Sequence, residues 1–305
     1  MSQSGAASAL CEKRIEDFDA TRCLQMTQDV HLIAAQDGRC WVMRPGASCL
    51  IALPVSAVAA HSSSFAASLL EGAIRAGLTE RVDAAAPPYT LLGYIRWLVG
   101  NYIFAGQTPG LFLLAAESFE RSGRRDLADF ARGKAREEDG HANLAYLDLE
   151  ALGLPASQTI QALAPPSSKV FAERFRSYVE SSEPIALFGF SYCLERMAAE
   201  RDEAFIEKVM AVCPPGSHAF RFLKVHSAIG SDKAHVDEQL AFFERLSEGE
   251  LAIVARAAHA TGQLLARQAQ IDAELSDDEI ERRLLTARVE VKRGLLINFR
   301  RSGEV

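Results

Sequence analysis

Residues 137–153 read EEDGHANLAYLDLEALG, a stretch that combines an acidic cluster with regularly spaced apolar residues. At about 100° per residue, this stretch continues an amphipathic helix whose apolar stripe contains Leu127 and Leu149. Glu138 and His141 fall inside that stripe, one turn apart. Because an unpaired buried carboxylate is costly, the pair predicts an ion pair, a hydrogen-bond network or a metal site.

A second acid lies on an apolar helix face in YCLERMAAE, residues 192–200. Glu195 shares this face with Phe188 and Tyr192, whereas Glu200 points away from it, toward the solvated side of the helix. Glu195 is therefore the better candidate for a functional carboxylate in this segment.

The third segment, HSAIGSDKAH at residues 226–235, begins and ends with a histidine. Residues nine apart lie on opposite sides of a continuous helix, so the two imidazoles converge only if the helix is broken. Glycine is a poor residue inside a helix, and serine or aspartate can cap a new one. The sequence therefore predicts a break at Gly230 and Ser231, with Asp232 and His235 one turn apart beyond it.

Three separated segments thus offer carboxylates and imidazoles on core-facing positions. The candidate metal ligands are Glu138, His141, Glu195, His226, Asp232 and His235. A mixture of carboxylate and imidazole ligands suits iron or manganese better than zinc.

Helical periodicity runs through the chain after the paired prolines of AAAPP at 84–88, where a domain boundary is expected. The predicted helices cover residues 89–106, 109–121, 125–152, 168–181, 184–211, 217–229, 231–247, 249–274 and 277–296. Short loops with glycine or proline separate most of them. Residues 86–305 are therefore expected to form a helical bundle, which makes the fold class mainly α.

The N-terminal part reads differently, with a loose tail over residues 1–24 and a small α+β lobe over 25–85. Asp37-Gly38 is a strong signal for a hairpin turn, because glycine accepts positive φ. The lobe is expected to contain strands near 30–35, 39–44 and 48–53, followed by one or two helices within 55–81.

Composition excludes several classes of protein. The net charge of −7 gives no basic face for a nucleic acid. No apolar run is long enough to span a membrane, and the N-terminus lacks the pattern of a secretory signal. Six cysteines without CxxC spacing indicate reduced thiols. The expected location is the cytoplasm, without nucleic-acid or membrane partners.

The order of the three motifs, in EEDGHANLAYLDLEALG, YCLERMAAE and HSAIGSDKAH, resembles the haem-oxygenase-like superfamily, whose relatives include thiaminase II and the PQQ-synthesis oxidase. Within it, the similarity is greatest to the di-iron oxidases and oxygenases, and it covers roughly residues 89–275. The resemblance implies a seven-helix bundle with a central site that binds one or two Fe(II) ions and uses dioxygen as co-substrate. It also implies oxidation of a small organic acid or an amino-acid-like substrate.

Two features depart from the family pattern. The late segment has His-x5-Asp-x2-His, where members often have His-x3-Asp-x2-His. Some members supply a glutamate from the first core helix, yet residues 89–107 contain no aspartate or glutamate. A second metal ion is therefore expected to bind weakly.

Two other functions stay open on the sequence. One is a metal-free haem-oxygenase-like oxidase, or a thiaminase-like hydrolase with Cys193 as nucleophile. The other is a non-catalytic binding or scaffold protein whose N-terminal lobe recognises a peptide or protein. The expected partner is a small-molecule substrate, and a homodimer is an open alternative.

Overall fold

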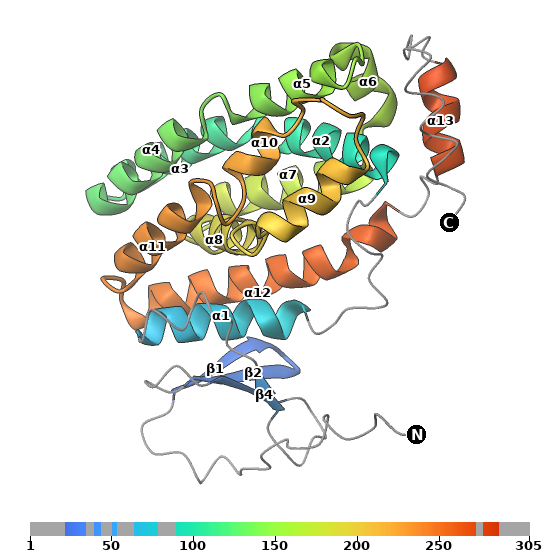
Figure 1. Ribbon diagram of the computed structural model, residues 1–305. Helices are drawn as coiled ribbons and strands as arrows, with labels where there is room; N and C mark the ends of the chain where they lie inside the picture. The colour runs from blue at the N-terminus through green and yellow to red at the C-terminus, as the bar shows by residue number, and fades with distance from the viewer. Residues whose placement is uncertain are drawn as a thin grey trace, which may run out of the picture. The chain divides into compact units, whose positions relative to one another are not determined.

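A computed structural model describes residues 22–34, 40–43, 51–53, 64–78, 90–272 and 277–286 (Figure 1). The chain divides into two compact units, and both contain segments that are distant in sequence. The first unit comprises the described parts of residues 1–82 with residues 185–194 and 235–266. The second comprises the described parts of 83–184, 195–234 and 267–305. The boundary expected at 84–88 lies outside the described residues.

The first unit contains a four-stranded antiparallel sheet in the order β1-β2-β3-β4. Its strands are β1 Arg22–Thr27, β2 Val30–Ala34, β3 Cys40–Met43 and β4 Ile51–Leu53. The last three match the predicted strands, whereas β1 begins inside the segment that was expected to be a tail. Ala34 pairs with Cys40 across the β2–β3 connection. The predicted turn at Asp37-Gly38 lies outside the described residues.

Helix α1, Phe65–Leu78, packs on β2 and β3, and its buried face is rich in alanine and leucine (Figure 1). It also contacts α12, Glu248–Ile271, where Gly77 and Gly262 let the two backbones approach closely. The unit therefore has a sheet covered on one face by helices, and small residues set the spacing of the layers.

The second unit is built from helices. Those lying wholly in it are α2 Leu91–Ala105, α3 Thr108–Arg121, α4 Arg125–Glu138, α5 His141–Ala151, α6 Ala156–Leu163, α7 Pro166–Val179, α9 Glu203–Ala211, α10 Arg221–Val225 and α13 Asp277–Thr286. Three helices have residues in both units, namely α8, Ala186–Ala198, α11, Asp232–Phe243, and α12. No helix among the described residues is long and apolar enough to cross a membrane.

Local sequence explains where several of these helices begin. The side chain of Thr90 accepts a hydrogen bond from the backbone N–H of Gly93 at 3.0 Å and caps α2. Asp202 caps α9 in the same way through Phe205 at 2.8 Å. Such side-chain oxygens satisfy donors that have no partner within the helix. Helices α3 and α7 have proline in their first turn, where its missing N–H costs nothing.

Helix α2 lies at the centre of the second unit and contacts α5, α6 and α7 (Figure 1). Its side chain Tyr94 is fully buried, stacks on Trp97 and Phe220, and donates a hydrogen bond to the carbonyl of Ala219 at 2.7 Å. A large aromatic ring that is buried with its hydroxyl group hydrogen-bonded is strongly stabilising. Tyr94 therefore holds α2 against the segment that leads into α10.

Two helices that the sequence predicted as continuous are each interrupted. The helix expected over 125–152 is divided into α4 and α5, and the one expected over 184–211 is divided into α8 and α9. The cause of the first break is Gly140, whose φ of 84° is incompatible with a right-handed helix. The second break ends at Asp202, whose cap starts a new helix. Helix α6 was not predicted at all.

Candidate metal centre

Glu138 and His141 lie on the two sides of the break between α4 and α5. Glu138 is the last residue of α4, and His141 is the first residue of α5. The left-handed Gly140 between them turns the chain, and the two side chains meet with His141 Nδ1 3.2 Å from a Glu138 carboxylate oxygen. The predicted pairing is therefore present, although a turn of the chain and not a continuous helix produces it.

His226 follows α10 directly, in the loop that leads to α11. The predicted break at Gly230 and Ser231 is confirmed, because α10 ends at Val225 and α11 begins at Asp232. A Cβ atom at Gly230 would lie only 2.1 Å from the carbonyl oxygen of Val225. Only glycine fits such a close approach, so this residue sets the tight loop that presents the imidazole.

Asp232 is fully buried, and its two carboxylate oxygens lie 3.2 and 3.3 Å from Nδ1 of His226. The other ring nitrogen, Nε2, is buried and has no hydrogen-bond partner among the described residues. A carboxylate that accepts the Nδ1 proton leaves a lone pair on Nε2 and fixes the ring orientation. Asp232 thus orients His226 for a ligand at Nε2.

One oxygen of Glu138 and one ring nitrogen each of His141 and His226 lie within 4.8 Å of one another. The two imidazole rings are edge to face, with centroids 4.8 Å apart. Two ligands at right angles and about 2.1 Å from an ion are themselves about 3 Å apart, close to the observed 3.2 Å between His141 and Glu138. Two histidines and one carboxylate form the ligand set of many non-haem Fe(II) sites. The three residues therefore fit a divalent ion.

The charges of these residues also shift one another's pKa. Burial raises the pKa of Glu138, but the hydrogen bond with His141 and the charges of His226, His141 and Lys134 outweigh it and lower that pKa overall. Burial lowers the pKa of His141, but the hydrogen bond to Glu138 and the nearby carboxylates raise it overall. The site therefore stabilises a carboxylate facing a positive charge, which a metal ion supplies as well as a proton does.

Glu195, on α8, contacts a lysine in the described structure. Its carboxylate lies 3.1 Å from Nζ of Lys134, and both side chains are almost entirely buried. Lys134 is also 2.7 Å from a carboxylate oxygen of Glu137. Sequence reasoning missed Lys134, although it lies seven residues after Leu127 and so falls on the same core-facing stripe of α4.

Arg201 supports the loop that carries His226. Its guanidinium donates a hydrogen bond to the His226 carbonyl at 3.2 Å and lies over the ring of Trp97 at 5.3 Å. Burial lowers the pKa of Arg201, and the charge of Asp232 opposes that change. The arginine therefore adds a positive charge behind the Asp232 carboxylate.

His235 lies one turn after Asp232 on α11, in the part of that helix that belongs to the first unit. Its predicted role as a ligand stays a prediction, since the other ligand candidates lie in the second unit.

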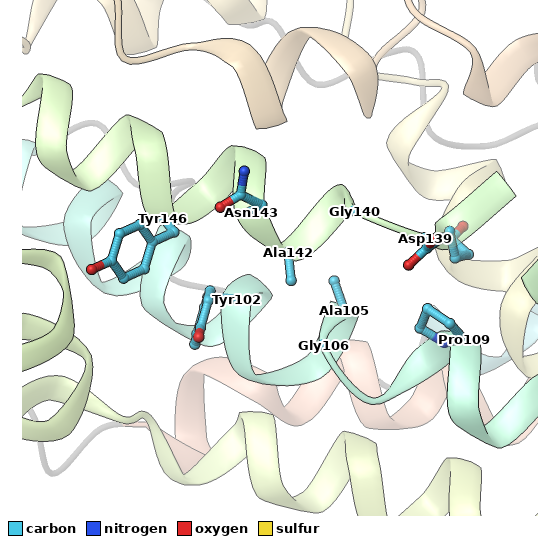
Figure 2. A pocket seen from close by; sticks show the side chains of 10 residues that line it. Tyr102, Ala105, Gly106, Pro109, Asp139, Gly140, Ala142, Asn143 and Tyr146 are labelled. Atoms are coloured by element: carbon cyan, nitrogen blue, oxygen red, sulfur yellow. The ribbon is translucent and has the colours of Figure 1, made fainter. Parts of the chain in front are cut away.

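A pocket of about 400 Å³ opens beside Glu138. Figure 2 shows residues of α2 and the start of α3 facing residues of the α4–α5 turn and α5 across it. The lining residues are Tyr102, Ala105, Gly106, Pro109, Glu138, Asp139, Gly140, Ala142, Asn143 and Tyr146. The rings of Tyr102 and Tyr146 lie 5.9 Å apart at its end. The wall of the pocket therefore contains the candidate metal ligand Glu138 together with aromatic and polar side chains.

Comparison with known proteins supports the fold alone. No family model matches the chain, and no curated protein matches its sequence. A crystal structure from Shewanella denitrificans OS217, a domain of unknown function with a haem-oxygenase-like fold, matches 72% of this chain and 90% of its own. The TM-score is 0.50, and 17% of the aligned residues are identical. The chain therefore consists mainly of a helical bundle with the haem-oxygenase-like fold, preceded by a small sheet.

Proposed function

We propose that the protein is a non-haem iron enzyme that uses dioxygen to oxidise a small organic molecule. The observation that carries the proposal is the cluster of Glu138, His141 and His226, in which the Nε2 atom of His226 is buried without a hydrogen-bond partner. A nitrogen placed in this way is costly unless it meets a ligand. Two histidines and one carboxylate leave coordination positions open, as an oxygen-activating iron needs.

The described residues would have different roles in such a site. Bound iron would activate dioxygen and pass to it the electrons that the oxidised substrate gives up. Glu138, His141 and His226 would hold the ion, and Asp232 would keep the His226 imidazole in the tautomer that presents Nε2. Arg201 would hold the backbone of the same loop in place. These contacts preorganise the ligands, which limits the reorganisation that binding requires.

The substrate would occupy the pocket beside Glu138. Among the described residues that line it there is no lysine, arginine or histidine, whereas Asp139 is one of the lining residues and the rings of Tyr102 and Tyr146 lie together at one end (Figure 2). A carboxylate beside aromatic rings favours a ligand that carries an ammonium group. We therefore propose an amino-acid-like substrate in preference to a simple organic acid.

Anaerobic titration with Fe(II) tests the proposal. The wild type is expected to bind iron with a dissociation constant that His226→Ala weakens by at least tenfold, followed by dioxygen uptake only in the iron-loaded protein. His218→Ala, which removes an exposed histidine before α10, is the matched control and should change neither property. Absence of iron binding, or binding that His226→Ala leaves unchanged, would contradict the proposal, as would tight zinc binding without dioxygen uptake.

The alternative of a cysteine-dependent hydrolase gains no support from the described residues. Cys193 is fully buried in α8 and does not line the pocket. A nucleophile must reach its substrate, so a packing role explains this cysteine better. Cys193→Ala is expected to retain dioxygen uptake, and loss of all activity in a folded Cys193→Ala protein would favour the hydrolase.

A further inference from the structure

We infer that the ammonium group of Lys134 takes the place of a second metal ion, so that this centre binds a single divalent ion. The inference rests on the proposed metal centre, and it concerns a residue for which the family resemblance assigned no role. It also makes Glu195 a partner of that ammonium group, whereas the sequence placed Glu195 among the metal ligands.

The geometry of Lys134 carries the inference. Its side chain is 2% exposed, and Nζ lies 2.7 Å from Glu137 and 3.1 Å from Glu195. Glu195 is itself only 6% exposed. A buried ammonium group costs several kcal/mol unless carboxylates surround it. Conversely, the buried carboxylate of Glu195 needs a cation, and Lys134 already supplies one.

Lys134 lies close in the chain to one of the three proposed ligands, Glu138. It lies one turn before Glu138 on α4, and its charge interacts with the carboxylate of Glu138 as well as with its two direct partners. A second divalent ion held partly by Glu138 would add positive charge near this ammonium group. Two such cations close together repel strongly in a buried environment.

The charges of the described residues balance with one ion. The carboxylates are those of Glu137, Glu138, Glu195 and Asp232. Lys134 contacts Glu137 and Glu195, its charge also acts on Glu138, and the charge of Arg201 acts on Asp232. With neutral histidines, one divalent ion brings the net charge of these six side chains to zero, whereas a second would bring it to +2. Buried uncompensated charge is strongly unfavourable.

Metal stoichiometry tests the inference without recourse to catalysis. Metal-free protein is equilibrated with Mn(II), and bound manganese per folded chain is measured by mass spectrometry and by electron paramagnetic resonance. The wild type is expected to bind one Mn(II) per chain and to show the spectrum of an isolated ion. Two bound ions with an exchange-coupled spectrum would overturn the inference on Lys134 and leave the metal centre intact. No bound ion would overturn both.

Variants at Lys134 sharpen the test. Lys134→Ala removes the ammonium group that contacts Glu137 and Glu195 and opens the space it fills, so the expected stoichiometry rises from one Mn(II) to two. The double variant Lys134→Met with Glu195→Gln removes both charges while keeping the side-chain volumes, and it is expected to return to one ion. Lys169→Ala, which removes a lysine that is 80% exposed, is the matched control and should stay at one.

Folding of each variant is checked by circular dichroism before the metal is counted. One ion in a folded Lys134→Ala protein would overturn the inference, because an empty position between carboxylates should then accept a metal. If Lys134→Ala does not fold, the number of Mn(II) ions bound by the wild type and by the neutral double variant still tests the inference. Two bound ions in either protein would contradict it.

Discussion

At the scale of single residues, we expect the contact between Asp232 and His226 to set the metal affinity of the proposed centre. Asp232→Asn keeps the size of the side chain but presents an amide to Nδ1 in place of a carboxylate. Loss of a carboxylate behind a ligating histidine weakens metal binding by about 10–100-fold. Competitive titration against a chelator is expected to show a decrease of this size.

Asp237→Asn is the matched control, because Asp237 is exposed on the same helix. It should leave metal affinity unchanged. If Asp232→Asn and Asp237→Asn bind the metal equally well, Asp232 does not orient His226 in the manner described.

The sequence identified six candidate ligands, five of which lie in the second unit of the structure, but it did not find the partner of Glu195. Helical phase identified Glu138 and His141 because neighbours three residues apart stay close even when a turn replaces the helix. The partner of Glu195 could not be found in this way, because the contact with Lys134 joins α4 to α8, which are distant in sequence. Such contacts depend on helix packing, which periodicity alone does not specify.

At the scale of elements, the turn between α4 and α5 depends on Gly140. Its φ of 84° lies in the left-handed region, and a Cβ atom there would meet no other atom within 4 Å. Gly140→Ala should therefore cost about 1–2 kcal/mol from backbone strain alone. Gly140→Asn should cost less, because asparagine tolerates this conformation. Chemical denaturation measures both.

Gly133→Ala provides the contrast within the same helix. Gly133 lies inside α4, and a methyl group there would meet only the end of the Arg136 side chain, at 4.0 Å. Alanine should stabilise the helix by roughly 0.5–1 kcal/mol. Equal effects of Gly133→Ala and Gly140→Ala would show that the α4–α5 turn is not strained in the way its φ indicates.

The attachment of α10 to α5 depends on Asp148. This carboxylate is fully buried and accepts hydrogen bonds from the backbone N–H of Phe222 at 2.9 Å and from Arg221 at 3.1 Å. Asp148→Ala leaves the Phe222 N–H without its partner, so it should lower the free energy of unfolding by about 1–3 kcal/mol. Glu150→Ala, at an exposed position of α5, should change it by less than about 0.5 kcal/mol.

The breaks between elements show which local signals the sequence carries clearly. The break before α11 was predicted from Gly230 and Ser231, which lie between His226 and His235 in the sequence. On one continuous helix these two histidines could not converge. The break at Gly140 was not predicted, because the apolar stripe continues across it with the same phase. A single glycine is weak evidence for a break, since helices tolerate glycine at a cost of about 1 kcal/mol.

At the scale of the whole molecule, the proposed metal centre would join α4, α5 and the α10–α11 loop. Its ligands Glu138 and His226 are 88 residues apart in the sequence. An ion bound to ligands from all three should stabilise the folded chain by about 2.7 kcal/mol at a metal concentration a hundred times the dissociation constant. Because the entropy of unfolding grows with chain length, removal of the metal should lower Tm by about 4 °C in a protein of this size.

Thermal unfolding with and without a chelator measures this effect. The change in Tm should be absent in His141→Ala, which lacks a ligand. A chelator effect of the same size in wild type and His141→Ala would show that the stabilising ion binds elsewhere.

The overall fold could be predicted from the sequence more completely than the function. Helical periodicity and the order of three motifs were sufficient to predict the haem-oxygenase-like bundle, which the Shewanella structure shares at 17% identity. A shared fold does not establish a shared reaction, because chemistry depends on particular side chains. The pocket beside Glu138 depends on the turn at Gly140 and on the approach of α2, neither of which the sequence pattern specified.

The most direct test of the metal centre is a crystal structure of the protein soaked anaerobically with Fe(II), with diffraction data collected on both sides of the iron absorption edge. The account predicts one anomalous peak in contact with Glu138, His141 and Nε2 of His226, and the Lys134 ammonium group still between Glu137 and Glu195. An iron peak elsewhere, or the absence of any peak in fully loaded crystals, would contradict it.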